Sequence, residues 1–331
     1  ASPSDDTIAA KVEAARETLS AYRTSKVNQY RSICHSFQAA ARDFHLTGDD
    51  SHGRQCAALL RFLVQHYREI DHPPTFTLAE LVIAIDQCEE SGGLTDADRV
   101  LAAEWLRQMV EDSMVFWELR EPVRRYQQGA LRPIWNHQTY PALGVALAAQ
   151  FLRAHYDVEA ADYWAAVMEN LFAGQINSPQ PLEDSANYQW SVPCHTSRYV
   201  LSTGRQTAYF SNGVLRECLD YAIASHDAFG NEATHGDAWQ AFGSVAAKLF
   251  RLGAALYADE GCMWLLKLTD GGSESAMWQY APSCKATAPV DHVGLRRFLV
   301  DPLRADALGV KGVPEGRVLD KVVMRSGWSK E

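Results

Sequence analysis

Residues 140–156, YPALGVALAAQFLRAHY, are almost wholly apolar up to Gln150. Their apolar side chains are spread around a helix instead of lying on one face, and a helix that is apolar on most sides is buried on most sides. Gln150 breaks the apolar run well short of the roughly 18 residues that a membrane span needs. We therefore expect a buried helix here and no membrane partner.

The sequence on both sides of this stretch predicts further helices. Apolar residues recur at helical spacing in a series of segments that begin at capping residues or end at glycine and proline. These segments are about 5–22, 26–44, 54–67, 77–91, 95–114, 157–172, 191–201, 212–225 and 237–257. Apolar and polar residues alternate, as in a β-strand, at the end of the chain, in residues 316–328. The fold class predicted from these patterns is all-α, with a short β segment at the C-terminus.

Helices of this length joined by short loops fit a bundle, an α-solenoid or a closed ring of helical hairpins. The apolar helix at 140–156 favours the ring, because an inner layer of helices is there covered by an outer layer. We therefore expect an (α/α) toroid, an incomplete barrel of helical hairpins, over residues 1–315. Residues 316–331 form the predicted C-terminal strand segment.

Composition narrows the function classes. The chain has 331 residues and a formal net charge of -10, which argues against a nucleic-acid partner because such a protein needs a basic face. The seven cysteines form no CxxC pair, no zinc spacing and no disulfide framework, so most are expected to be buried small apolar residues, and whether any pair forms a disulfide stays open. No ligand cluster or cofactor motif stands out, and we expect neither a catalytic metal nor a cofactor.

One stretch next to the buried helix is more polar than packing in a core would require. Residues 131–140, LRPIWNHQTY, place Asn136, His137 and Gln138 at the entrance of the buried helix. They fit a helix cap made by Asn136, or a donor cluster for a carboxylate at the positive end of the helix. Arg132 and Trp135 come just before them.

Two further clusters precede predicted helices. Residues 181–190, PLEDSANYQW, concentrate acids, amides, Tyr188 and Trp190 in a loop, and residues 229–237 carry His235. Polar loops on a rigid helical scaffold are frequent sites, although both also suit helix capping.

These motifs resemble polysaccharide lyases with an (α/α) toroid, namely the alginate-lyase and heparinase II/III-like groups. The resemblance lies in Asn136-His137 at the head of an apolar helix, in Glu183-Asp184-Ser185 with Tyr188, and in the tail at 323–330. It implies that the tail is similar to the strand that opens a β-sandwich in heparinase II/III-like enzymes, and that the sandwich itself lies outside this chain. Other toroid lyases are complete as one domain.

The resemblance implies cleavage of a 4-linked uronic acid, as in alginate or glucuronan, by β-elimination. Asn136 and His137 would hold the substrate carboxylate and stabilise the enolate-like charge at the reacting centre. A phenol, whose pKa is about 10 when free, can act as base and then as acid where nearby cations lower that pKa, so Tyr188 is the candidate for both proton transfers. One group serving both steps makes the elimination syn.

The remaining candidates would bind the anionic polysaccharide around this centre. They are Arg132, Trp135, Gln138, Glu183, Trp190, His195, Arg198 and His235. His195 and Arg198 are expected to lower the pKa of the tyrosine or to hold a flanking carboxylate. Trp135 and Trp190 either stack on sugar rings or pack in the core.

Two other classes remain open. A toroid glycoside hydrolase acting on uronic-acid oligosaccharides needs two carboxylic acids, and Glu183 or Asp184 with Asp237 could supply them. A non-catalytic carbohydrate-binding toroid would keep the aromatic residues alone. The chain opens with Ala-Ser-Pro-Ser-Asp-Asp, which fits either a removed export signal or a trimmed start, and we expect a secreted or periplasmic protein.

Overall fold

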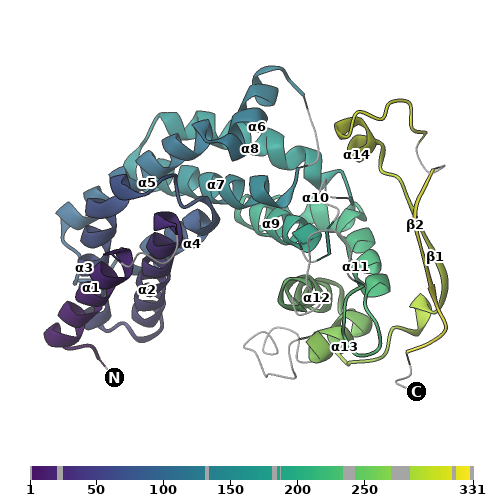
Figure 1. The fold of residues 1–331 in the computed structure, drawn as a ribbon, viewed down its shortest axis with the longest axis horizontal. Coiled ribbons are helices and arrows are strands. Elements are labelled where there is room, and N and C mark those ends of the chain that lie inside the picture. Colours follow the sequence, from purple (N-terminus) through teal and green to yellow (C-terminus); the bar gives the residue numbers. More distant parts are fainter. Residues whose placement is uncertain are drawn as a thin grey trace. The chain divides into compact units, whose positions relative to one another are not determined.

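The structure is a computed structural model that describes residues 2–20, 25–130, 134–180, 185–186, 188–233, 243–269, 284–314 and 318–328. It is mostly helical, as the sequence patterns predicted, and its described residues form one two-stranded sheet (Figure 1). None of the described helices is both long enough and apolar enough to cross a membrane.

The first half of the chain contains α1 (Asp5–Ser20), α2 (Lys26–Thr47), α3 (Asp50–His66), α4 (Leu78–Cys88), α5 (Asp96–Val115), α6 (Trp117–Gln127) and α7 (Asn136–Tyr156). It also has two 3-10 turns, η1 (Tyr67–Glu69) and η2 (Thr75–Thr77). The second half contains α8 (Ala160–Ile176), α9 (Tyr188–Ser202), α10 (Gln206–Ser211), α11 (Val214–Ser225), α12 (Gly243–Tyr257), α13 (Glu260–Thr269), η4 (Val290–His292), β1 (Gly294–Leu299), α14 (Pro302–Ala307) and β2 (Leu319–Arg325).

The chain divides into two compact units. Unit 1 consists of Ala1–Gly129 with Tyr140–Glu169, and unit 2 consists of Ala130–Thr139 with Asn170–Glu331. The first turn of α7 therefore groups with unit 2, and the rest of that helix groups with unit 1.

Unit 1 is built from helical hairpins whose alternate helices run in the same direction. α2 and α3 are antiparallel, because the Tyr30 hydroxyl at the start of α2 donates 2.7 Å to the Leu63 carbonyl near the end of α3. α2 also packs against α4, and α3 packs against α5. The Tyr67 hydroxyl, just after α3, donates 2.8 Å to Asp112 near the end of α5, so α3 and α5 end on the same side.

α7 is buried on most sides, as its composition predicted. Ala142, Val145, Ala148 and Leu152 are all fully buried, and apart from Gln150 the polar positions lie in the first and last turns of the helix. A helix with this burial has neighbours around most of its circumference, so α7 is an interior helix of the fold.

α7 runs beside α4 within unit 1, and the two helices are parallel. The rings of Phe76 and Tyr140 lie 4.9 Å apart at the start, and a Cβ placed on Gly144 would fall 2.6 Å from Leu78 Cγ. At the other end, the Tyr156 hydroxyl donates 2.8 Å to Glu89. This close approach requires glycine at position 144, because any Cβ there would collide with Leu78 on α4.

In unit 2 the two-stranded sheet of β1 and β2 packs against a helix. β1 and β2 pair antiparallel, from Gly294 opposite Arg325 to Leu299 opposite Leu319. The ring of Phe298 lies 4.9 Å from that of Tyr221 on α11, which anchors β1 by an apolar contact. Figure 1 shows the two strands side by side at the yellow end of the chain.

The end of β2 is fastened by polar contacts. Arg325 donates 3.1 Å to the Ala224 carbonyl and also donates to the His226 carbonyl, while its guanidinium lies 3.8 Å from the centre of the Trp328 ring. The strand predicted within residues 316–328 is therefore present as β2, but its partner β1 was not predicted.

The predicted burial of most cysteines is confirmed. Among the described residues all are free, and all except the half-buried Cys284 are buried. They act as small apolar side chains of the core.

Candidate active site

The first turn of α7 presents the polar cluster that the sequence singled out. The helix starts with Trp135 in the capping position, since the Trp135 carbonyl accepts from the N–H groups of Gln138 and Thr139 at 2.9 and 3.2 Å. Asn136 is thus the first helical residue, not the cap. Its Oδ1 accepts from the His137 N–H at 2.8 Å, so its amide nitrogen remains the group that can donate to a ligand.

These side chains differ in exposure. Asn136 and Gln138 are buried, whereas His137 and Trp135 are half-buried. The indole of Trp135 lies 4.9 Å from the imidazole of His137, with the ring planes tilted by 36°. Trp135 can therefore offer part of its surface next to His137, as a residue that stacks on a sugar must.

α9 supplies the second part of the site. It begins at Tyr188, where the Gln189 N–H bonds to the Ser185 carbonyl at 3.2 Å. The Tyr188 side chain is 37% exposed, while most of the residues that follow it on α9 are buried. Tyr188 is thus an accessible phenol at the start of an otherwise buried helix.

A buried hydrogen bond joins these two segments. The Thr139 hydroxyl lies 2.9 Å from His195 Nδ1, and both side chains are buried. Thr139 also donates 2.9 Å to the Asn136 carbonyl. A hydroxyl has one hydrogen, so its oxygen accepts from His195 Nδ1–H, and the lone pair of the imidazole lies on Nε2.

The positions of Asn136 and Tyr188 along their helices relate them to the hydrogen bond between Thr139 and His195. Asn136 is three residues before Thr139, and Tyr188 is seven residues before His195, so each pair shares one face of its helix. The bond between Thr139 and His195 therefore joins the α7 face that carries Asn136 to the α9 face that carries Tyr188, with Tyr188 about two helical turns, or ~10 Å along α9, from His195.

His195 is neutral in the folded protein. Burial, reinforced by the nearby positive charges of Arg198 and Lys248, lowers its pKa from 6.5 to about 3. A neutral His195 adds no positive charge that could lower the pKa of the tyrosine, which was one of the two roles expected for it, and it acts through its hydrogen bond instead. Arg198 is half-buried and Lys248, on α12, is exposed, so the positive charge at this junction comes from these two side chains.

Sequence reasoning missed Lys248. It lies 53 residues after His195 (248 − 195 = 53), in a helix with no polar motif around it, and only the packing of α12 against α9 brings it to this place. Thr139 was in the quoted stretch, but nothing in the sequence indicated its partner.

Trp190 does not have the placement expected of a sugar-stacking residue. It is 2% exposed, its ring lies 5.4 Å from that of Tyr221, and its indole N–H donates 2.6 Å to Glu232. Neither face is open to a sugar in this structure, and we assign Trp190 to the core instead. A buried indole needs a hydrogen-bond acceptor, and Glu232 supplies it.

The cavity beside α9 is too small for a sugar. It measures about 20 Å3 and is lined by Gln189, Trp190, Pro193, Tyr221 and Phe298, among others. A space of this size holds about one water molecule.

Several predicted site residues lie outside the described residues. They are Arg132, Glu183 and His235, together with the acids Asp184 and Asp237 of the hydrolase alternative. Of the described candidates, the structure groups Asn136, His137, Trp135, Gln138, Tyr188, Trp190, His195 and Arg198 in unit 2.

No protein-family model matches this chain, and no curated protein matches it either.

Proposed function

We propose that this protein is a polysaccharide lyase that cleaves a 4-linked uronic-acid polysaccharide, such as alginate or glucuronan, by β-elimination. The observation that carries the proposal is the hydrogen bond between Thr139 and His195, because it joins the donor-bearing start of α7 to the helix that begins with Tyr188. Two cations, Arg198 and Lys248, stand near this junction and suit an anionic substrate.

The first chemical task is to hold the uronate carboxylate. The C5 proton lies α to that carboxylate and becomes acidic enough to remove only when donors stabilise the enolate-like charge. The amide nitrogen of Asn136 and the imidazole of His137 are the proposed donors, and the N-terminus of α7 adds the positive end of the helix dipole. Trp135 would flank the bound sugar.

The second task is proton transfer. Tyr188 would take the C5 proton as a phenolate and return a proton to O4 of the leaving sugar, which makes the elimination syn. Its exposure allows it to reach a bound polymer. His195 is the poorer base, because an imidazole whose pKa is about 3 has little affinity for a proton. Tyr199, another phenol on α9, is 3% exposed and stacked on Phe172 in the core.

The proposed scaffold is an (α/α) toroid. Its support within unit 1 is that α2 packs against α4 and α3 against α5, with α4 and α7 parallel. Such pairing of alternate helices is what layered helical hairpins require. The hydrolase alternative depends on acids outside the described residues, so no observation favours it over the lyase.

The test is incubation of the purified chain with a panel of polyuronates, followed by ultraviolet absorbance of the unsaturated uronate. A lyase forms this product, while a hydrolase releases reducing ends without the absorbance and a binding protein does neither. His137→Ala should weaken both substrate binding and turnover, because the carboxylate loses a donor. Cleavage without the unsaturated product would refute the proposal.

A further inference from the structure

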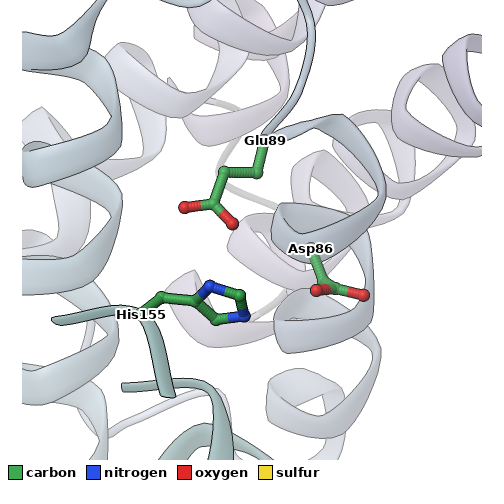
Figure 2. A group of neighbouring side chains, drawn as sticks. All are labelled: Asp86, Glu89 and His155. Carbon is green, nitrogen blue, oxygen red and sulfur yellow. The ribbon is translucent and has the colours of Figure 1, made fainter. Parts of the chain in front are cut away.

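A second polar cluster lies in unit 1, away from the residues of the proposed lyase site. Asp86 and Glu89 at the end of α4 and His155 near the end of α7 each offer one ligand atom, and these atoms lie within 4.8 Å of one another (Figure 2). Asp86 and His155 are exposed and Glu89 is half-buried. We propose that these three side chains bind a zinc ion that links α4 to α7.

The helix geometry explains why the three ligands meet. Asp86 and Glu89 are three residues apart, so their carboxylates lie on the same face of α4. α4 and α7 run parallel from the contact between Leu78 and Gly144, and eleven residues further along each chain come Glu89 and His155 (89 − 78 = 11; 155 − 144 = 11). Equal advance along two parallel helices brings their ends to the same level.

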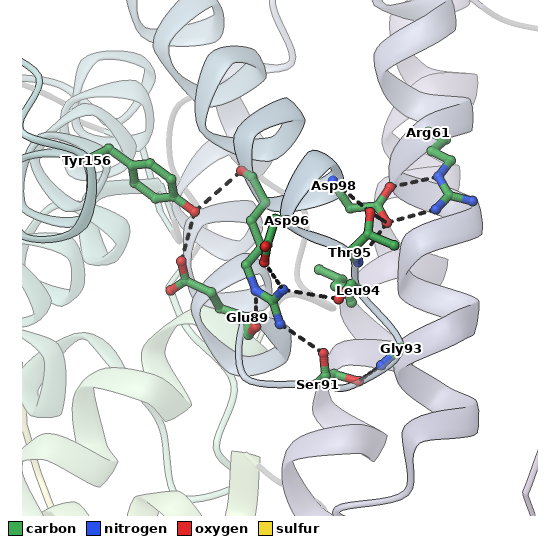
Figure 3. A network of polar contacts seen from close by, with 10 residues as sticks. Arg61, Glu89, Ser91, Gly93, Leu94, Thr95, Asp96, Asp98 and Tyr156 are labelled. Carbon is green, nitrogen blue, oxygen red and sulfur yellow. Dashed lines mark hydrogen bonds and ion pairs between the residues drawn. The ribbon is translucent and has the colours of Figure 1, made fainter.

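Glu89 is held in position by a neighbouring hydroxyl. The Tyr156 hydroxyl donates 2.8 Å to Glu89 Oε1, as Figure 3 shows, and the carboxylate keeps its second oxygen for a cation. Carboxylates that bind metals are usually oriented by such a hydrogen bond. The ring of His155 lies 4.9 Å from that of Phe151, one turn earlier on α7.

The backbone at Glu89 is fixed as well. Arg99, at the start of α5, donates to the carbonyls of Glu89, Ser91 and Leu94 at 2.8, 3.0 and 3.1 Å. One guanidinium thus holds the turn that follows α4. Glu89 therefore stands on a rigid support, as a metal-binding side chain requires.

The ligand types select the metal. One imidazole and two carboxylates suit zinc, which binds nitrogen and oxygen at about 2.0–2.2 Å and leaves a fourth tetrahedral position for water. Tetrahedral ligands at that distance lie about 3.4 Å apart, and the exposed side chains of Asp86 and His155 can close the remaining gap by small rotations. Magnesium and calcium prefer sites made wholly of oxygen.

The experiment is a calorimetric titration of the chelator-treated full chain with zinc chloride. We expect one zinc ion per chain, with a dissociation constant on the order of micromolar because the site has three protein ligands and an open side. His155→Ala should abolish this binding, and Asp86→Asn should weaken it at least about tenfold. Tyr156→Phe, which removes only the orienting hydroxyl, should weaken it by about 10–100-fold.

His45→Ala is the matched control, because it removes another exposed histidine of unit 1. It should leave zinc affinity unchanged. Zinc should also raise the unfolding temperature of the wild type and of His45→Ala, but not that of His155→Ala. Absence of saturable binding by the wild type, or equal affinity in His155→Ala, would overturn the assignment, whatever the outcome of the polyuronate assay.

Discussion

The buried histidine at the junction of α7 and α9 should make the protein less stable in mild acid. His195 stays neutral in the native protein because its pKa is about 3, whereas an unfolded histidine takes up a proton near pH 6.5. The unfolded state therefore binds more protons between these two values, and stability is lost as the pH falls through 6.5.

The size of the effect follows from linkage. At pH 5 the unfolded histidine is almost fully protonated and the native one is not, so lowering the pH from 7 to 5 costs about 2 kcal/mol of unfolding free energy. His226 adds a similar cost, because burial lowers its pKa to about 4. The free energy of unfolding of a domain is about 5–15 kcal/mol in total, so a loss of this size is readily measured.

Urea unfolding followed by circular dichroism at pH 7 and pH 5 measures this loss. His195→Gln removes the titrating group but keeps a side chain that can bond to Thr139, so its loss between the two pH values should be about 2 kcal/mol smaller than in the wild type. His45→Gln, at an exposed position, should behave like the wild type. Equal losses in wild type and His195→Gln would refute the assignment of His195 as a buried neutral group.

Two further predictions test the packing of unit 1 by urea unfolding. Gly144→Ala places a Cβ 2.6 Å from Leu78 Cγ, and the clash should cost about 1–3 kcal/mol despite a helix-propensity gain of about 1 kcal/mol; a net gain would contradict the close packing of α4 and α7. Burial raises the pKa of Asp98, but hydrogen bonds that Arg61 and Thr95 donate to its carboxylate outweigh burial and leave that pKa at about 2 (Figure 3). Asp98→Asn should thus lose about 2 kcal/mol at pH 7, and this deficit should shrink progressively as the pH falls from about 5 through the native pKa of about 2; a deficit independent of pH would contradict the ion pair.

The helices that sequence reasoning found are those with an apolar stripe and a recognisable start. Residues 95–98 read Thr-Asp-Ala-Asp, and in the structure Thr95 and Asp98 form the reciprocal capping box that starts α5. α6 was missed because its sequence, WELREPVRRYQ, is strongly charged and contains Pro122, although Leu119, Val123 and Tyr126 recur at helical spacing. The helix also carries ion pairs of Glu121 with Arg124 and Arg125.

The candidate site was predictable only where its residues are neighbours in sequence. Asn136 and His137 stand together, and the pattern around Tyr188 lies in one loop, so both could be named. The partner of His195 and the cation at Lys248 depend on which helices pack together, and sequence spacing carries no information on that. The choice between core and sugar contact for Trp190 depended on Glu232, 42 residues away (232 − 190 = 42).

Tyr188 is proposed to transfer both protons in a uronate elimination. The rate at which Tyr188→Phe forms the unsaturated uronate is the sharpest test of this role. The variant keeps the ring and its packing, so its melting temperature should match the wild type, and Tyr163→Phe on α8 is the control for losing an exposed phenol. We expect a loss of about 10³-fold or more in turnover for Tyr188→Phe and little change for Tyr163→Phe. A folded Tyr188→Phe protein that keeps more than about a tenth of wild-type activity would contradict this role.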